Sequence, residues 1–146
     1  MATNDVQVGP WGSKSGVNPW TFTPNGKIWQ IRINTGSCVD SIRFTYKDHD
    51  RVSHHSETYG GDGGSSHTIT FADDESLIGI SGTVAVFGGN TVITSLSFIT
   101  NKMTHGPYDT IQRTSFSLPV TKGRFSGFHG NYGDYIDSFG VILHPY

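Results

Sequence analysis

The segment that decides the fold is Gly133-Asp134-Tyr135-Ile136-Asp137-Ser138-Phe139-Gly140-Val141, at residues 133–141. It begins with a glycine four residues before an aspartate, a combination that is typical of a tight turn. It then continues as a strand whose apolar side chains alternate, at Phe139, Val141 and Leu143. A period of two places these side chains on one face of a β-strand. The segment therefore predicts a turn followed by a strand with one buried face.

The same turn, serine and alternating strand occur twice more in the chain. They appear as Asp40-Ser41-Ile42-Arg43-Phe44 and as Thr94-Ser95-Leu96-Ser97-Phe98. A second element, an aromatic residue or histidine followed by a glycine, begins at Trp11, Tyr59 and His105, at steps of 48 and 46 residues. Three units of about 45–50 residues predict three similar sheets around a pseudo-threefold axis. Chance similarity between serine-rich strands is the alternative interpretation.

Alternating apolar residues dominate the rest of the chain, as at 29–33 (WQIRI) and 42–46 (IRFTY), with turn clusters such as 23–26 (TPNG) between them. The 19 glycines and 12% aromatic residues suit short strands joined by tight turns. We identify no helical period with caps. A chain of 146 residues is the usual size of one domain. We therefore expect a single all-β domain.

Charge and cysteine content argue against several function classes. The net charge of −2, with 15% charged residues, disfavours a nucleic-acid or anionic-membrane surface, which needs clustered Lys and Arg. The single cysteine, Cys38, leaves no internal disulfide and fits a reducing compartment. Residues 1–5 (MATND) lack the features of a signal peptide, and no apolar run reaches transmembrane length, so we expect a cytoplasmic or nucleocytoplasmic protein. The seven histidines lack the paired spacing of a zinc site, so we expect neither metal nor cofactor.

Two of the three units carry the pattern Gly-x-x-x-Asp, from Gly36 to Asp40 and from Gly133 to Asp137, whereas Thr94 stands at the third position. A glycine lets the backbone turn sharply and present N–H groups without a side chain in the way. An aspartate beside those donors offers two acceptor oxygens. Adjacent sugar hydroxyls both donate and accept, so this set suits a hexose. The alternative is an aspartate that only caps a turn.

Several stretches, taken in chain order, carry a resemblance to a known family. They are 8–12 (VGPWG), 59–64 (YGGDGG), 106–108 (GPY) with 116–120 (FSLPV), and 127–140 (GFHGNYGDYIDSFG). Together they resemble the jacalin-related lectins over essentially the whole chain. The resemblance implies a β-prism I fold of three four-stranded Greek-key sheets in a lectin domain at 7–146, after a polar tail or linker at 1–6. It also implies non-catalytic binding of mannose/glucose-type glycans, because the galactose-preferring members are cleaved and this chain is intact before Gly16.

The resemblance implies two sugar sites at one end of the prism. In the first, Asp137 accepts hydrogen bonds from sugar hydroxyls beside the N–H donors of the loop; its residues are Gly16, Gly133, Asp134, Tyr135 and Asp137. The second site would be built in the same way from Gly36, Ser37, Cys38, Asp40 and Gly64. The third glycine loop is replaced by 109–113 (DTIQR), which is consistent with an inactive third site.

The partners that the resemblance implies are mannose- or glucose-containing glycans and glycoproteins, without nucleic acid or membrane. It permits a homodimer and an N-terminal dirigent-like domain in a longer protein. One rival interpretation is a protein-interaction module whose sugar sites have decayed, favoured by Lys14 in a first loop that departs from the family pattern. A second rival is a hydrolase or isomerase, which needs a carboxylate pair at glycosidase spacing. Asp40 and Asp137 lie in different units, each with its own loop.

Overall fold

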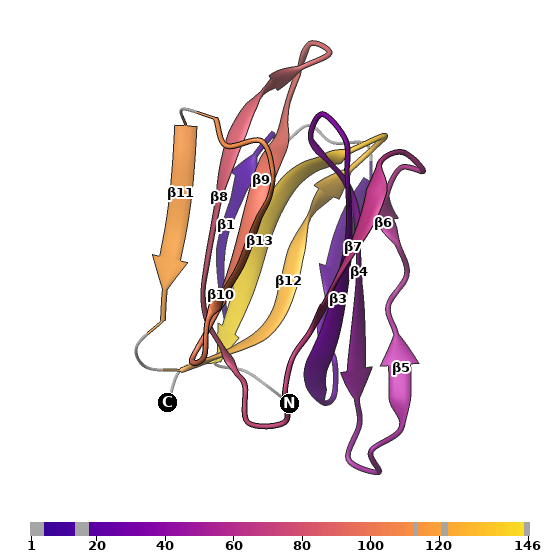
Figure 1. Cartoon of the computed structure of the whole chain (residues 1–146), viewed down its shortest axis with the longest axis vertical. Coiled ribbons are helices and arrows are strands. Elements are labelled where there is room, and N and C mark those ends of the chain that lie inside the picture. Colours follow the sequence, from indigo (N-terminus) through magenta and orange to yellow (C-terminus); the bar gives the residue numbers. More distant parts are fainter. Residues whose placement is uncertain (1–4, 14–17, 113, 121–122, 145–146) are drawn as a thin grey trace.

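The computed structural model describes residues 5–13, 18–112, 114–120 and 123–144, and these form strands, turns and loops with no helix (Figure 1). The expectation of an all-β domain is therefore confirmed. Since the described residues include no helix, they hold none that is long and apolar enough to cross a membrane. The strands form three antiparallel sheets that pack around one core.

The three sheets gather strands from different parts of the chain. The first sheet has the order β1 (Val6–Gly12), β13 (Ile136–His144), β12 (Arg124–Tyr132) and β2 (Asn18–Phe22). The second has the order β10 (Thr104–Asp109), β9 (Asn90–Thr100), β8 (Leu77–Phe87) and β11 (Thr114–Pro119). The third has the order β5 (Ser53–His55), β4 (Val39–Lys47), β3 (Lys27–Thr35) and β7 (Ser65–Thr70), with β6 (Tyr59–Gly60) also paired with β4.

Each sheet has the Greek-key order, in which three consecutive strands are neighbours and the fourth returns beside the first. In the second sheet β8, β9 and β10 are neighbours in sequence, and β11 crosses back to pair with β8. The third sheet repeats this order from β3 to β7, and the first repeats it through β12, β13, β1 and β2. The third sheet contains five strands instead of the expected four, because its edge strand is interrupted between β5 and β6.

Strand register confirms the predicted repeat and corrects one detail of it. Ser138 pairs with Gly12, Ser41 pairs with Gly60, and Ser95 pairs with Asp109. The three serines therefore occupy equivalent places. The counterpart of Trp11-Gly12 in the third unit is consequently Tyr108-Asp109 rather than His105-Gly106, because the register shift between His105 and Tyr108 matches the one between Val8 and Trp11 in the first unit.

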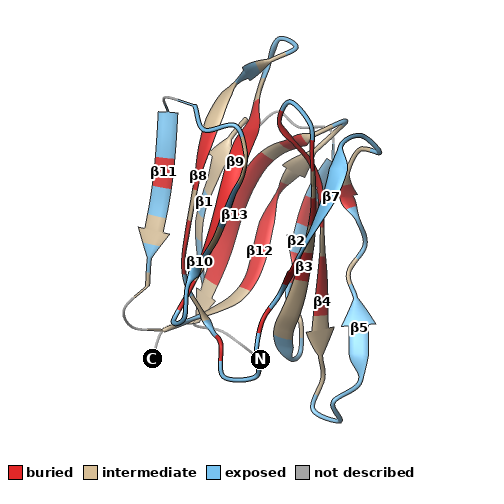
Figure 2. Cartoon of the chain, in the orientation of Figure 1, coloured by how far each residue is buried: buried red, intermediate tan, exposed pale blue. Residues whose placement is uncertain are grey.

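The core lies between the three sheets and is filled by the alternating side chains that the sequence indicates (Figure 2). Phe44 is fully buried and lies between Phe22 and Phe128, with ring centroids 4.8 and 4.9 Å apart and nearly parallel planes. Burying one such side chain contributes roughly 1.5–3 kcal/mol. Trp20 is also buried and stacks on Tyr59, so this tryptophan belongs to the core rather than to the surface. The packed centre fixes where the turns of each sheet emerge.

Candidate functional site

The two Gly-x-x-x-Asp turns have the same backbone conformation and lie at one end of the molecule, at the top of Figure 1. The N–H of Gly36 donates to the carbonyl of Cys38 at 3.1 Å, and the N–H of Gly133 donates to the carbonyl of Tyr135 at 3.0 Å. Within the described ranges the next two N–H groups of each turn donate no backbone hydrogen bond. Each turn thus has two N–H groups without a backbone acceptor beside its aspartate, among the described residues.

In the first turn the carboxylate of Asp137 is half-buried and close to the glycine that precedes it. A Cβ atom at Gly133 would lie 3.5 Å from Oδ2 of Asp137, so the missing side chain leaves that oxygen accessible. No hydrogen bond from another described residue reaches this carboxylate. Burial, followed by the charge of Asp134, raises the pKa of Asp137. Among the described residues, therefore, none occupies its acceptor oxygens.

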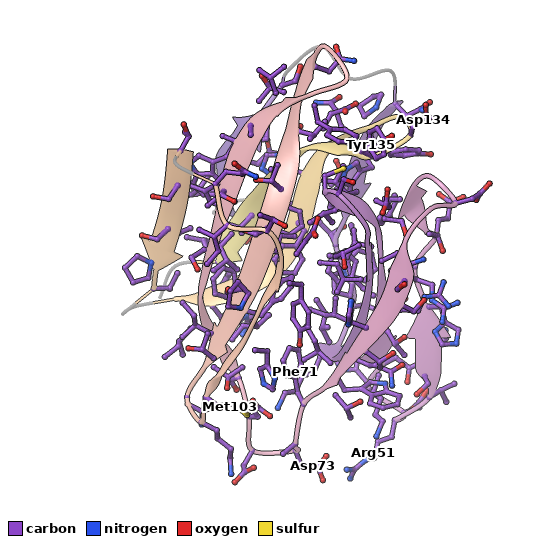
Figure 3. The ribbon with its side chains drawn as sticks, turned by 45° about the horizontal axis from the view of Figure 1, so that its top comes forward. Arg51, Phe71, Asp73, Met103, Asp134 and Tyr135 are labelled. Atoms are coloured by element: carbon purple, nitrogen blue, oxygen red, sulfur yellow. The ribbon has the colours of Figure 1, made fainter. Side chains whose placement is uncertain are left out.

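The loop after β1 holds the backbone of Asp137 in place. Gly12 has a φ of +109°, and a Cβ atom there would collide with the carbonyl of Asp137. The N–H of Ser13 donates to that carbonyl at 2.9 Å. The rest of this loop, including Lys14 and the predicted donor Gly16, lies outside the described residues. Asp134 and Tyr135 lie together at the same end (Figure 3).

In the second turn the carboxylate of Asp40 lies among three glycines, Gly36, Gly63 and Gly64. A Cβ atom at Gly36 would lie 3.2 Å from Oδ2, and one at Gly63 would lie 3.3 Å from Oδ1. A Cβ atom at Gly64, where φ is +83°, would collide with Oδ2. The structure therefore brings together the residues predicted for the second site. It adds Gly63, which sequence reasoning missed although the glycine run around it was a visible signal.

The backbone of Asp40 is held as that of Asp137 is. The N–H of Gly61 donates to the carbonyl of Asp40 at 3.0 Å, and a Cβ atom at Gly60, with φ +119°, would collide with the same carbonyl. Gly60 and Gly61 are therefore the counterparts of Gly12 and Ser13.

The aspartate of the second turn is more buried than that of the first. Only 5% of Asp40 is exposed, and its Oδ2 has no hydrogen-bond partner within the described residues. Burial raises the pKa of Asp40. Cys38 is fully buried, so its N–H, a predicted donor, is covered by neighbouring atoms, whereas Tyr135 is half-buried and Ser37 is exposed. Burial, with the charge of Asp40 second, raises the pKa of the Cys38 thiol to about 12, which leaves it neutral and unreactive.

The third unit has no free acceptor at the equivalent position. Thr94 is 2% exposed, and its hydroxyl lies 2.8 Å from that of Thr83. Thr83 also accepts a hydrogen bond from the N–H of Gln112, which fixes the loop after β10. Asp109 stands where the other units have Gly12 and Gly60 and adopts a φ of +73°. A side chain therefore stands at a position where, in the other two units, a Cβ atom would collide with the carbonyl of the aspartate.

An aromatic contact on the first site was not predicted. Phe87, at the end of β8, packs edge-on against Tyr135, with ring centroids 5.2 Å apart at 86°. The tip of the β8–β9 hairpin thus lies beside the first turn. The signal in the sequence is the Gly88-Gly89 turn that follows Phe87, which typically joins two strands. Reading it alone would not show which loop the hairpin reaches.

A hollow lies at the other end of the molecule, near Phe71 in Figure 3. Its volume is about 680 Å³, and its lining includes Lys27, Glu75 and Arg124. Glu75 already accepts hydrogen bonds from Ala72 N at 3.0 Å and Thr100 Oγ1 at 2.6 Å, and lies 2.7 Å from Nε2 of His105. This carboxylate stabilises the loop before β8 and has little capacity left for a ligand. Across the described ranges no three His, Cys, Asp or Glu side chains are grouped so as to hold a metal.

Comparisons with known proteins agree with this arrangement. A family model described as "Jacalin-like lectin domain" matches residues 8–142. A mannose/glucose-specific lectin from Parkia pendula is 40% identical over 148 residues, which cover 96% of this chain but only 32% of the relative's length. The Malaysian banana lectin structure is 36% identical, with a TM-score of 0.87 and coverage of 97% of this chain and 99% of that one. A mannose-binding jacalin-related lectin from Ananas comosus is 34% identical, with a TM-score of 0.87 and coverage of 99% and 100%.

These likenesses extend over the whole fold. The solved structures share the three-sheet β-prism, which confirms the expected fold class. The relatives are lectins, which bind carbohydrates without catalysis, and so they give no support to the hydrolase or isomerase interpretation. The chain therefore belongs to the family of jacalin-like lectin domains.

Proposed function

We propose that this domain binds mannose/glucose-type glycans through the two Gly-x-x-x-Asp turns at one end of the prism. The observation that carries the proposal is the first turn, where the Asp137 carboxylate lacks a partner among the described residues and stands beside the free N–H groups of Asp134 and Tyr135. The mannose specificity in the names of two relatives supports the class of sugar.

The chemistry of the first site follows from its donors and acceptors. The two oxygens of Asp137 accept from neighbouring hydroxyls of one pyranose, and charge-assisted bonds of this kind are stronger than neutral ones. The N–H groups of Asp134 and Tyr135 donate to sugar oxygens on the other side of the turn. Gly16 is assigned as a further donor from the first loop. Five or six bonds at ~1 kcal/mol each, less the cost of immobilising the sugar, give a dissociation constant of about 1 mM.

The second site is proposed to bind the same class of sugar more weakly. Asp40 and the N–H of Ser37 are arranged as in the first site, but Asp40 is 95% buried by its glycine neighbours. A sugar must displace part of the surrounding loop to reach Oδ2 and the N–H of Cys38. That displacement costs free energy, so the first site fills before the second.

The experiment is an NMR titration of the amide signals with methyl α-mannopyranoside. Wild-type protein is expected to show shifts around Tyr135 first and around Ser37 at higher sugar concentration. Asp137→Asn keeps the shape of the side chain but removes its charge. It should lower the mannoside affinity read from the shifts around Tyr135 at least about tenfold. Asp62→Asn, an exposed change elsewhere in the glycine loop, is the matched control and should leave both sets unchanged. Unaltered mannoside affinity in the Asp137→Asn, Asp40→Asn double variant would refute the proposal.

The burial of Asp40 also favours a second candidate, in which only the first site binds sugar and the second has decayed. In that case Ser37 would not shift at any mannoside concentration, and Asp40→Asn would leave the titration as in the wild type. A glycan array without any hit would indicate that the first site has also lost sugar binding. It would leave a β-prism that acts only as a protein-interaction module.

A further inference from the structure

The outward face of the third sheet places two arginines side by side. Arg32 on β3 pairs in register with Arg43 on β4, and Thr68 on β7 pairs with Arg32 on the other side. The flanking residues Ile31 and Ile33 are fully buried. Since successive residues of a strand point to opposite faces, the arginine side chains lie on the solvent side. Both are partly exposed.

No described residue neutralises these two charges. Neither arginine forms a salt bridge within the described residues, and Nε of Arg43 is buried without a hydrogen-bond partner. Glu57, in the gap between β5 and β6, is exposed and makes no ion pair within 4 Å. Like charges directly opposite one another destabilise a sheet. The pair therefore carries a cost that an external anion would remove.

The fold itself does not require arginine at these positions. In the second sheet the equivalent row consists of Ser117, Ser81 and Ser97, which pair in register. In the first sheet the equivalent pair is His129 with Gly140. A row of three serines is thus compatible with the same strand pairing. The arginine pair is a feature of the third sheet alone.

The surroundings of the pair are cationic and rich in neutral hydrogen-bonding groups. Lys47, also on β4, lies over the ring of Trp29 at 5.1 Å. Strands β3, β4, β5 and β7 contribute one carboxylate, Asp40, and it lies among the glycines of the end loops. Gln30 and Thr70, one row from the arginines, offer an amide and a hydroxyl and are joined by a hydrogen bond of 3.3 Å. We call the outward residues Gln30, Arg32, Asn34, Arg43, Lys47 and Thr68 the arginine face.

We propose that the arginine face binds an acidic polysaccharide, whose sulfate or carboxylate groups are held by Arg32 and Arg43. Guanidinium groups bind such anions through paired hydrogen bonds. The hydroxyl and amide groups between the cations match the hydroxyls between the anionic groups of a polysaccharide. A single-stranded nucleic acid would instead need exposed aromatic rings for stacking, and Trp29 is covered by Lys47.

The arginine face is separate from the proposed mannose sites. Those sites lie in the turns at one end of the prism, where the acidic residues Asp40, Asp134 and Asp137 gather, and these repel an anionic chain. The arginine face runs along the side of a sheet. The two surfaces are therefore expected to bind neutral and acidic sugars independently.

The test measures binding of dextran sulfate and polygalacturonate to the whole chain by biolayer interferometry, with neutral dextran as the reference. Both acidic polymers should bind and weaken as salt rises, whereas dextran should not bind. Arg32→Ser with Arg43→Ser, which copies the serine row of the second sheet, should weaken binding at least about tenfold. Arg32→Lys with Arg43→Lys keeps the charge and should lose less. Lys102→Ser with Arg124→Ser removes the same charge elsewhere and should change affinity less than about twofold.

Three outcomes would overturn the proposal. One is unchanged polymer binding in the serine double variant, with its melting temperature showing that it is folded. Another is competition by excess methyl mannoside, or loss of polymer binding in Asp137→Asn, which would place the polymer at the mannose site. The last is equally tight binding of poly-aspartate at the same charge density, which would indicate an acidic protein partner. Because mannoside binding is measured separately, failure of the mannose proposal leaves this test intact.

Discussion

Replacing Gly64 with alanine should disrupt the second site through two separable effects. The first is conformational, because Gly64 has a φ of +83°, a region that residues with a Cβ atom rarely adopt. The second is steric, because the new Cβ atom would collide with Oδ2 of Asp40 and lie 2.7 Å from the carbonyl of Thr35. The loop must therefore move away from the carboxylate.

A second glycine measures the conformational effect by itself. Gly88 has a φ of +62°, and a Cβ atom there has no neighbour within 4 Å. Gly88→Ala should thus cost only the backbone strain, about 1–2 kcal/mol. Gly64→Ala adds the displacement of packed atoms, which costs a further ~1–3 kcal/mol. A difference of this size corresponds to about 2–10 °C in melting temperature for a domain of this length.

The assay combines urea unfolding with a mannoside titration of each variant. Gly64→Ala should be less stable than Gly88→Ala and should lose the shifts at Ser37, while those at Tyr135 remain. Gly88→Ala should keep the shifts at Ser37. If the two variants are equally stable, the close contact between Gly64 and Asp40 is wrong. If Gly64→Ala loses the Tyr135 shifts as well, the two turns are not independent.

Two further predictions concern the first turn and the opposite end of the molecule. Gly133→Ala should lower mannoside affinity at the first site at least about fivefold, because the new methyl group stands beside Oδ2 of Asp137, where the sugar hydroxyls would bind. Stability should change little, because that methyl group makes only an ordinary contact, at 3.5 Å, with Oδ2. An unfolding midpoint shifted as far as that of Gly64→Ala would contradict this. Hydrogen bonds from Thr100, then those with His105 and the Ala72 N–H, lower the pKa of Glu75 from 4.5 to about 2. The folded state therefore binds this proton less readily than the unfolded state, so the stabilisation is present above pH 4.5 and is lost as pH falls toward 2. Glu75→Gln should cost about 1–3 kcal/mol at pH 7 and flatten the acid limb of the stability curve, and an unchanged limb in urea melts between pH 2 and 5 would contradict this.

The sequence was sufficient for the all-β fold and for the three units because strand alternation and turn glycines are local signals. Phe139 and Val141 alternate within a few residues, and both are buried as expected. The prediction placed the third counterpart at His105-Gly106, although Gly9-Pro10-Trp11 and Gly106-Pro107-Tyr108 match in the sequence and carry the same register shift in the structure. The break in the edge strand between β5 and β6 was not predicted, because it depends on which of these residues pair with β4.

Site residues that are close in the sequence could likewise be predicted, whereas those brought together by other loops or strands could not. Gly36 and Asp40 were found together because only three residues of one turn separate them, whereas Gly63 and Phe87 reach the sites from other loops. Arg32 and Arg43 lie eleven residues apart in the chain and become neighbours only through the register of β3 and β4. Composition alone therefore argued against a cationic surface that strand pairing creates. Contacts across strands carry the information that a single sequence leaves out.

The three units show why one fold can hold sites of different strength. Backbone contacts fix each turn: the carbonyls of Asp137 and Asp40 accept from Ser13 and Gly61, whatever their side chains do. The side chains at the aspartate position are consequently free to differ without loss of the fold. Thr94 is the example without a carboxylate, because its hydroxyl bonds to the protein itself and leaves nothing for a ligand. Since stability lies in the backbone and binding lies in the side chain, substitution at Asp137 should remove sugar binding while the domain stays folded.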